Sequence, residues 1–549
     1  MANKSTSKST FKFKNHQRIG AVQAEFDTEF LQDCFIDTGD LEIATDVKNP
    51  RSILVGRTGS GKSALLLKVK ECEENVIEIS PENLSLDYIS NSNIISFFEE
   101  AGLNLDILFR FLWKHVLIVE LLKHKYDLKN ESATSAFLSN ITGLLKRDRQ
   151  KQKGIQYLKQ WGEKFWEDTE FRVKEVVSNI ENKLKADVKS ISPTFTLSAE
   201  AAKTLTDSQR QEIVERGKKA VSEIQIRDLA EAIKFLAEDV FTNGQQRHYL
   251  IIDRLDENWA SKKIRYKLIR ALIEEIKSFR KIGCLKILIT MWLDLLEDVF
   301  EKTKDAGFQE EKYRDLLLPI QWNEENLLDL VKSRINHLLK YNYTNHSVQF
   351  DSIFPGSIRK RKTFDYLIER TFMRPRDIIS YLNFVLERAA GKSSITVDLI
   401  QSAEEDYSEE RIRSVEHEWA SIHPSLAICK SILEKRRDGF RIQEISEDQL
   451  NEISMSLAFD DKYIIDSLSA SASAYLNHGI TSNSFRYDLI NALYHVGMVG
   501  IKQGPRHGTK WSFNSHSIIG KLNLKSDMRV YIHPMFWRNL DISAQDEDS

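Results

Sequence analysis

The sequence predicts an α/β fold with a parallel sheet at its core, and three stretches carry this prediction. Each is a short apolar run that ends in polar residues and is followed by a helical pattern, as expected for strands of a parallel sheet. They are residues 52–55 (SILV), 248–252 (HYLII) and 285–290 (LKILIT). Two further runs, at residues 75–80 (NVIEIS) and 316–321 (LLLPIQ), extend the predicted sheet to five strands.

Length and composition limit the number of domains, the partners and the cellular location that this chain can have. A chain of 549 residues is long enough for two to four domains. The formal net charge of −3 provides no global positive field, so any contact with nucleic acid must be local. The four cysteines form no CxxC pair, which argues against a zinc site or a disulfide framework. No apolar run approaches the roughly 20 residues that span a bilayer, and the polar first fifteen residues exclude a secretory signal. We therefore expect a cytoplasmic protein without a membrane anchor.

A glycine-rich loop follows the first predicted strand. Residues 56–63 read GRTGSGKS, the full G-x-x-x-x-G-K-[ST] pattern of a P-loop. Its glycines allow successive backbone N–H groups to turn toward phosphate oxygens at the positive end of the next helix. Lys62 is placed to bridge the β- and γ-phosphates, and Ser63 to supply a hydroxyl to Mg²⁺. A turn without a ligand is disfavoured, because the pattern lies between a predicted strand and a predicted helix. The expected contacts of ATP are Gly56, Arg57, Thr58, Gly59, Ser60, Gly61, Lys62, Ser63 and Ala64.

Three carboxylates follow the strand at residues 248–252, within the sequence DRLDE. Carboxylates this close repel one another unless a cation, a proton or water separates them. Asp253 directly follows the strand, at the position where P-loop proteins have the acid that binds Mg²⁺. Asp253 and Ser63 are therefore the expected metal ligands. Glu257 or Asp256 would orient the attacking water in hydrolysis; Glu257 is preferred and both are kept. Simple capping of the next helix is the alternative, and it suits Asp256 better than Asp253.

The chain resembles a known class of P-loop ATPases. The order of P-loop, strand, acid strand, polar-tipped strand, arginine and strand is similar to that of AAA+ and STAND ATPases. DRLDE is similar to the acid strand of STAND and NACHT-type ATPases, with Arg254 where glycine is common. A family of largely bacterial P-loop ATPases, often found among antiviral defence genes, is similar from about Gly20 to the C-terminus. Its resemblance is carried by residues 35–65, 250–259, 371–389, 406–419 and 532–540.

The resemblance implies roles for four further residues. Thr290 is placed as a γ-phosphate sensor, although polar residues are common at strand ends. Arg314 is a weaker candidate for an arginine finger that reaches the nucleotide of a neighbouring copy in a homo-oligomer. Arg374 and Arg376 flank Pro375, which suits the first turn of a helix. In lids of this class such an arginine folds over the nucleotide, and Arg376 is preferred to Arg374. Trp292 departs from the pattern, because many related ATPases have an arginine directly after the sensor strand.

The remaining sequence predicts an α/β P-loop NTPase core with a large helical insertion, a helical lid and a C-terminal winged-helix-like domain. In the insertion, Trp161, Phe165, Trp166 and Phe171 are expected to pack in a core, and the basic cluster at residues 146–153 to be solvated. Residues 485–515 predict a helix, a strand, a turn at 504–508 and a returning strand. The expected parts are a flexible basic tail at 1–19, the core at 20–80 and 242–322, the insertion at 81–241, the lid at 323–405 and the C-terminal domain at 406–549.

Two classes of function remain open at this point. The first is an ATP-hydrolysing switch, the ATPase of a bacterial antiviral defence system, that controls a partner effector protein. The second is a DNA-handling ATPase similar to replication initiators, with Lys502, Arg506, His507 and Lys510 of the winged helix on DNA. An ABC or SMC-type ATPase is rejected, because the nearest match to the required signature, FTLSAEAAK, lacks both glycines. A third alternative is that hydrolysis is vestigial and ATP is a structural ligand.

Overall fold

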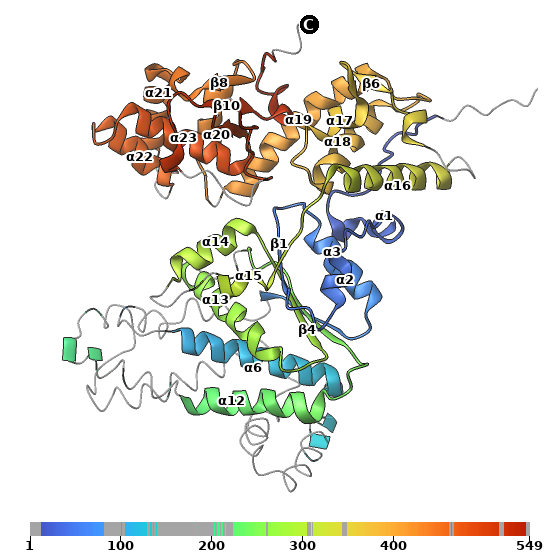
Figure 1. Ribbon diagram of the computed structural model, residues 1–549, viewed down its shortest axis with the longest axis vertical. Coiled ribbons are helices and arrows are strands. Elements are labelled where there is room, and N and C mark those ends of the chain that lie inside the picture. The colour runs from blue at the N-terminus through green and yellow to red at the C-terminus, as the bar shows by residue number, and fades with distance from the viewer. Residues whose placement is uncertain are drawn as a thin grey trace, which may run out of the picture. The chain divides into compact units, whose positions relative to one another are not determined.

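The computed structural model describes residues 12–81, 105–128, 223–257, 262–304, 311–342, 349–420, 422–460, 466–504, 506–514 and 521–544, with scattered residues between these ranges. The chain divides into two compact units, which are described separately (Figure 1). The sheet unit comprises Gly39–Gly56 and Lys62–Ile320, and the lid unit comprises Met1–Thr38, Arg57–Gly61 and Gln321–Ser549. The tip of the P-loop thus belongs to the lid unit and its two flanks to the sheet unit.

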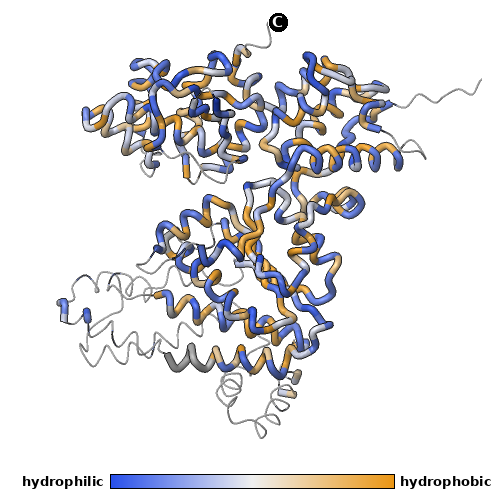
Figure 2. The backbone as a smooth tube through the Cα atoms, viewed as in Figure 1, coloured by the Kyte–Doolittle hydropathy of each residue, from blue (hydrophilic) through white to orange (hydrophobic). Residues whose placement is uncertain are grey.

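The sheet unit is built on five parallel strands in the order β2-β3-β4-β1-β5. The three central strands are buried at every position, as expected where helices cover both faces of a parallel sheet. They run through the sheet unit as continuous hydrophobic segments (Figure 2). All five strands lie within two residues of the predicted runs. Their bounds are β1 Ile53–Val55, β2 Val76–Ile79, β3 His248–Ile252, β4 Leu285–Met291 and β5 Leu317–Pro319.

Helices complete the sheet unit, and two of them come from the predicted insertion. Helix α6 packs against α13, where the indole of Trp113 donates to the Leu268 carbonyl at 2.8 Å. Buried Glu275 of α13 is paired with Arg110 at 2.6 Å and Lys114 at 3.2 Å. Because α6, α12 and the strands share one hydrophobic cluster, these parts of the insertion belong to the core. The helices are α2 Asp40–Thr45, α3 Lys62–Cys72, α6 Asp106–Tyr126, α12 Glu223–Phe235, η4 Leu236–Val240, α13 Lys262–Phe279, α14 Leu293–Lys302 and α15 Glu311–Arg314.

Several predictions for the insertion fall where no structure is described. The aromatic set Trp161, Phe165, Trp166 and Phe171 and the basic cluster at residues 146–153 lie outside the described residues. None of the helices that the structure describes is long and apolar enough to cross a membrane.

The lid unit contains residues that the sequence assigned to a flexible tail. Phe13 and Ile19 are buried in its core, and Phe13 exchanges backbone hydrogen bonds with Gly391 and Lys392. Residues 12–19 therefore pack against the lid, since two apolar side chains among the basic ones suffice to anchor them. The first elements of the unit are η1 Ala24–Phe26, α1 Thr28–Asp33, α16 Glu324–Asn342, η5 Phe350–Ser352, β6 Ser357–Ile358, β7 Arg361–Lys362, α17 Thr363–Ile368, α18 Pro375–Arg388 and α19 Val397–Trp419.

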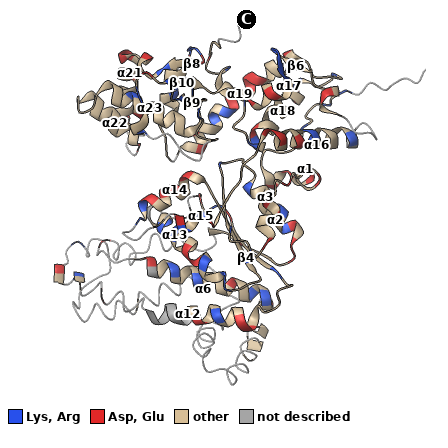
Figure 3. Cartoon of the chain, in the orientation of Figure 1, with Lys and Arg blue, Asp and Glu red and all other residues tan. Residues whose placement is uncertain are grey.

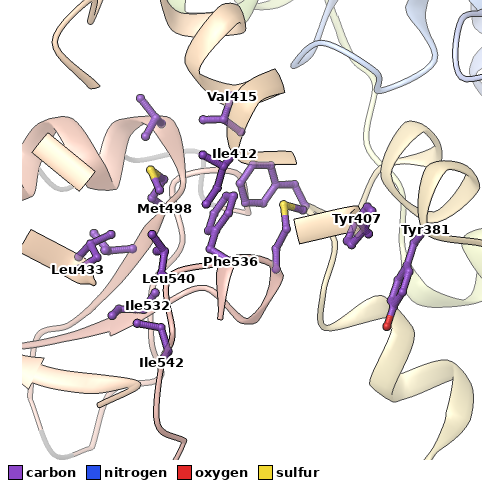
Figure 4. Packing of buried hydrophobic residues seen from close by; sticks show 14 of the residues in the cluster. Tyr381, Tyr407, Ile412, Val415, Leu433, Met498, Ile532, Phe536, Leu540 and Ile542 are labelled. Atoms are coloured by element: carbon purple, nitrogen blue, oxygen red, sulfur yellow. The ribbon is translucent and has the colours of Figure 1, made fainter. Parts of the chain in front are cut away.

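The C-terminal part of the lid unit combines helices with a three-stranded antiparallel sheet in the order β8-β10-β9. It is continuous with the lid, because α19 runs through the expected boundary at residue 406. Figure 4 shows Phe536 of η10 beside Ile412 of α19 in the shared core. The elements are α20 Leu426–Cys429, η6 Lys430–Leu433, β8 Gly439–Arg441, η7 Ile442–Glu444, α21 Glu447–Ala458, α22 Ser467–Leu476, α23 Ser482–Val496, β9 Val499–Lys502, η9 Lys521–Asn523, β10 Arg529–Ile532 and η10 Pro534–Phe536.

The returning strand expected directly after the 504–508 turn is not formed among the described residues. Only Lys510 pairs with β9, in an isolated bridge to Ile501 with two hydrogen bonds of 2.9 Å. The long partner of β9 is instead β10, which lies later in the chain. The backbone N–H and C=O of Ile501 both bond Lys510, so this bridge lies on the edge of β9 that β10 does not use.

Candidate functional site

Three predicted site residues meet at the carboxyl edge of the parallel sheet. Ser63 lies in the first turn of α3, Asp253 directly after β3, and Thr290 near the end of β4. The Ser63 hydroxyl lies 3.5 Å from Oδ2 of Asp253, and the Thr290 hydroxyl donates to Oδ1 of the same carboxylate. Because parallel strands end at a common edge, the sheet order places β3 and β4 side by side and brings these oxygen atoms together.

Lys62 and Arg254 shape the two sides of this oxygen cluster. The Lys62 ammonium donates to the Gly56 carbonyl at 2.7 Å, so the side chain folds back along the loop. Arg254 has φ of 61°, a left-handed conformation that a side chain disfavours. Its backbone N–H donates to Oδ1 of Asp253 at 2.9 Å. The position where related proteins often have glycine thus adopts a glycine-like backbone and helps to orient Asp253.

The two candidate water-activating acids differ in environment. Burial raises the pKa of Asp256 above its usual value; nearby Lys62 lowers this pKa and Asp253 raises it, so Asp256 senses the charges of the site. Glu257 is exposed, and its carboxylate lies 3.6 Å from Nε of Arg254. Arg265 fixes the backbone of both acids, with hydrogen bonds to the carbonyls of Glu257 at 2.7 Å and Asp256 at 3.4 Å. The structure therefore places Asp256 within electrostatic reach of the P-loop lysine, and Glu257 in an exposed position beside Arg254.

In the lid unit, the tip of the P-loop contacts the start of helix α18. Arg374, the N-cap residue, donates to the Thr58 carbonyl at 2.5 Å and to Asp377 at 2.8 Å. The backbone N–H of Arg376 reaches the Gly59 carbonyl at 3.4 Å. A Cβ added at Gly59, which has φ of +79°, would lie 2.6 Å from Cβ of Arg376. Glycine is therefore required at this position both for its backbone conformation and for the close approach of Arg376.

Polar atoms without hydrogen-bond partners surround this tip. Among the described residues, the hydroxyls of Thr58 and Ser60 and Nε of Arg376 are buried without a hydrogen bond. All three groups are potential donors, and buried donors without partners are rare and costly. Burial, together with the neighbouring Arg374, lowers the pKa of Arg376, as expected for a crowded cation. A phosphate group is the kind of ligand that would satisfy these donors.

Arg57 is directed away from the phosphate-binding side of the loop. Its guanidinium donates to the carbonyls of His495 at 2.8 Å and Val496 at 3.3 Å, and to the hydroxyl of Ser512 at 2.9 Å. It also lies over the Trp419 ring, 5.6 Å from the centroid. A contact of the nucleotide with the Arg57 backbone stays a prediction, while its side chain holds the C-terminal part of the lid unit.

The structure also places residues that the motif did not single out. The Trp322 indole donates to the Ser60 carbonyl at 2.8 Å, which fixes the loop from a second side. No sequence signal distinguished Trp322 from an ordinary apolar residue before a helix. Ala64 follows Ser63 in the first turn of α3.

Arg314 is exposed at the amino end of β5. This is the sheet edge opposite to Asp253 and Thr290, so Arg314 is not brought to the site of its own chain.

The residues at the sheet edge fit a magnesium ion better than a transition metal. The available ligands are the Asp253 carboxylate and two hydroxyls, and hard oxygen ligands suit Mg²⁺. Mg²⁺ typically binds through one or two protein groups, with phosphate and water completing its shell. In the part of the chain that the structure describes, no group of three or more His, Cys, Asp and Glu residues is placed to hold a metal.

Comparisons with known proteins find similarity to a family model, to a bacterial protein and to a solved structure. The model of the FunZ-associated C-terminal helical domain matches residues 325–416, in the lid unit. The putative transposon gamma-delta 80.3 kDa protein of Escherichia coli (strain K12) is 20% identical over 537 residues, which cover 96% of this chain and 67% of that protein. The crystal structure of Cdc6p from Pyrobaculum aerophilum is 11% identical, with a TM-score of 0.28 and coverage of 92% of this chain and 94% of that one.

The fold and the loop define the class of this protein. A P-loop between β1 and α3, beside a parallel sheet with an acid at the tip of β3, is an α/β P-loop fold. A helical C-terminal part is attached to it, in which the residues similar to the FunZ-associated domain begin within α16 and end within α19.

Proposed function

We propose that this protein binds ATP with Mg²⁺ at the P-loop and hydrolyses it. One observation carries the proposal: the Ser63 and Thr290 hydroxyls converge on the two oxygens of Asp253. This arrangement assembles a P-loop hydroxyl, an acid at a strand tip and a polar sensor from three distant parts of the chain. It is the constellation that phosphoryl transfer requires, because such catalysis depends on positioning and on neutralising phosphate charge.

The chain's own residues divide this task. Lys62 and the backbone N–H groups of the loop would bind the β- and γ-phosphates, and Thr290 would contact the γ-phosphate. Ser63 and Asp253 would hold Mg²⁺, which when bound neutralises phosphate charge. Asp256 or Glu257 would orient the attacking water and accept its proton. Arg376, whose buried Nε lies beside the loop tip, would contact phosphate oxygens.

We further propose that hydrolysis drives a molecular switch that controls a partner protein. The loop tip is tied to α18 through Arg374 and to the end of α23 through Arg57. A change in the loop on phosphate binding would therefore bias the helices of the lid unit. The resemblance to ATPases of antiviral defence loci favours an effector protein as the partner. Co-purification of the product of a neighbouring gene, insensitive to nuclease treatment, would support this role.

The binding step is tested by calorimetry of ATP with the full-length protein, with Mg²⁺ and with a chelator in its place. Replacement Lys62→Ala should abolish measurable affinity, because it removes the ammonium that we propose binds the phosphates. The matched control is Lys48→Ala, which removes an exposed lysine in the same unit and should leave the affinity unchanged. Equal affinities of wild type and Lys62→Ala would refute the proposal.

A DNA-handling ATPase is the second candidate. It is favoured by the sheet order β8-β10-β9, in which β8 precedes α21, α22 and α23 while β9 and β10 follow them, an arrangement also found in winged-helix domains. The similar Escherichia coli protein carries a transposon in its name, which also fits work on DNA. Lys502, Arg506, His507 and Lys510 lie on or beside β9 and its following turn. Salt-dependent binding of duplex DNA that is lost in Arg506→Ala/Lys510→Ala would favour this candidate over the effector-controlling switch.

A further inference from the structure

A short β-hairpin on the lid unit presents four consecutive basic residues. Strands β6 and β7 pair Ser357 with Lys362 and Ile358 with Arg361, so Arg359 and Lys360 alone form the turn. All four basic side chains are exposed. Figure 3 shows basic residues at this edge of the lid unit, beside the label of β6. The hairpin lies outside the P-loop and outside the β9 region, and neither proposed function uses it.

The turn has a conformation that its side chains disfavour. Arg359 and Lys360 have φ of 49° and 62°, which defines a two-residue turn of the I′ type. Asn-Gly is the preferred sequence for this turn, because both positions need a left-handed backbone. Strained residues of this kind concentrate at functional sites and persist where the surrounding structure fixes them. Arg359 and Lys360 occupy turn positions where Asn and Gly would be more stable, which indicates that their positive charges have a role.

The base of the hairpin is firmly anchored. Ile358 is 1% exposed and Thr363, directly after β7, is 2% exposed. The Thr363 hydroxyl donates to the Pro355 carbonyl, and its backbone N–H reaches the Gly356 carbonyl at 3.4 Å. The basic tip is thus held in a defined orientation on a packed support.

The charge of the hairpin is only partly neutralised within the lid unit. Arg361 forms an ion pair with Glu369. Among the residues that the structure describes, Lys360 and Lys362 have no carboxylate partner. Neighbouring like charges at an exposed tip repel one another, and an external polyanion would relieve this repulsion.

We propose that this hairpin binds the phosphate backbone of double-stranded DNA. Arginine and lysine are the residues that contact phosphates, and a two-stranded β-ribbon fits the major groove of a duplex. Residues 357–363 include no aromatic side chain on which unpaired bases could stack, which disfavours single strands. The apolar residues Ile358 and Phe364 are buried, so no side chain is available to enter a lipid bilayer. Duplex DNA is therefore the polyanion that fits best.

The proposal is tested with the double variant Arg359→Asn/Lys360→Gly of the full-length protein. Asn-Gly keeps or improves the turn while it removes two charges, so a loss of binding would not reflect misfolding. We expect at least a tenfold loss of affinity for a 30-base-pair duplex at about 0.1 M salt. The slope of log affinity against log salt concentration should fall by about 1.8, or 0.9 for each lost phosphate contact.

A matched control removes two other exposed cations of the same unit, in Lys340→Gln/Lys392→Gln. Its affinity and salt slope should stay close to those of the wild type. The thermal midpoint of Arg359→Asn/Lys360→Gly should equal or exceed that of the wild type, and its ATP affinity should be unchanged. Loss of DNA binding with intact ATP binding thus separates this site from the P-loop.

Several results would overturn the proposal. These are unchanged affinity and slope in Arg359→Asn/Lys360→Gly, or an equal loss in the control variant. Stronger binding of the wild type to a single strand of the same length would exclude a duplex site. Binding of the wild type to phosphatidylserine vesicles that is lost in the variant, without duplex binding, would assign the hairpin to a membrane surface.

Discussion

The guanidinium of Arg57 donates to the main-chain carbonyl of His495 at 2.8 Å, across 438 positions of the sequence. This contact joins a phosphate-binding loop to the end of helix α23. It is possible because α23 ends at Gly497 in a left-handed conformation with φ of 91°, and a Cβ at that position would lie 3.2 Å from Nη1 of Arg57. The loop tip is thus fixed by residues of the C-terminal part of the lid unit.

We predict that Arg57→Ala destabilises the protein. The variant loses two hydrogen bonds to carbonyls and one to Ser512, and a hydrogen bond to a charged group contributes about 1.5–3 kcal/mol net. Because Arg57 is half-buried, the lower end is appropriate, and we expect a loss of about 2 kcal/mol in the free energy of unfolding. Thermal unfolding provides the measurement. Arg51→Ala, which removes an exposed arginine, is the control, and equal midpoints for the two variants would contradict the prediction.

Asp253→Asn should remove the dependence of ATP binding on magnesium. The amide carries no charge and is a weaker ligand for Mg²⁺, while Lys62 and the loop backbone remain in place. Affinity measured with Mg²⁺ should therefore fall to the value measured with a chelator, whereas the wild type should show a clear difference. Asp315→Asn, at an exposed acid before β5, should behave like the wild type. An Asp253→Asn variant with full magnesium dependence would exclude Asp253 as a ligand.

Asp256→Asn should reduce ATP turnover more than Glu257→Gln, with ATP affinity retained in both variants. Loss of a general base costs about 10²-fold or more, and Asp256 is the acid whose charge is coupled to Lys62 and Asp253. Burial raises the pKa of Asp256, so the active carboxylate forms only above the usual range for aspartate. Turnover should therefore increase as the pH rises through this elevated pKa. Glu257→Gln should show the same increase, because this variant retains Asp256. If Glu257→Gln were the more damaged variant, the sequence-based preference for Glu257 would stand.

Asp377 should make the stability of the lid unit sensitive to acid. Burial alone would raise its pKa, but Arg374 at 2.8 Å and Arg411 at 3.3 Å outweigh burial and lower it. A carboxyl group whose pKa is lower in the folded than in the unfolded protein stabilises the fold at pH values above its unfolded pKa of about 3.9. This contribution is lost as the pH falls through the folded pKa.

The measurement compares thermal midpoints of wild type and Asp377→Asn between about pH 7 and pH 3. The variant should be less stable at pH 7 by about 3–5 kcal/mol, since it leaves buried arginines without their counter-charge. The difference between the two proteins should shrink as pH falls, because acid removes the same charge from the wild type. Asp365→Asn, at an exposed position of α17, should follow the wild type at every pH. A difference that is constant with pH would contradict the assignment.

The sheet and its edge could be predicted from the sequence because their signals are local. Each strand is a short apolar run, and the polar residue that ends it falls on a common edge once the strands are parallel. This rule places Asp253 and Thr290 at one edge of the sheet, whereas the neighbouring positions of β3 and β4, which bring their side chains together, are a finding of the structure. The glycines of the P-loop predicted a sharply turning backbone, and Gly59 and Gly61 have positive φ values in the structure.

Contacts that depend on distant segments could not be predicted. Nothing near Arg57 indicates that its partners are His495, Val496 and Ser512. The β6-β7 hairpin has strands of only two residues, which is too short for an alternating pattern, so its basic tip was missed. The basic character of residues 1–19 similarly outweighed Phe13 and Ile19 in predicting a flexible tail, although both side chains are buried in the structure.

The arrangement of α6 and α12 sets a limit on how this chain can be shortened. Both helices come from the stretch that interrupts the P-loop core in sequence, yet their side chains complete the same hydrophobic interior as β3 and β4. Deletion of residues 82–241 would remove Trp113 and its neighbours from the hydrophobic interior and expose α13 to water. Any shortened version of the protein must therefore retain both helices, and evolutionary trimming of the stretch faces the same physical barrier.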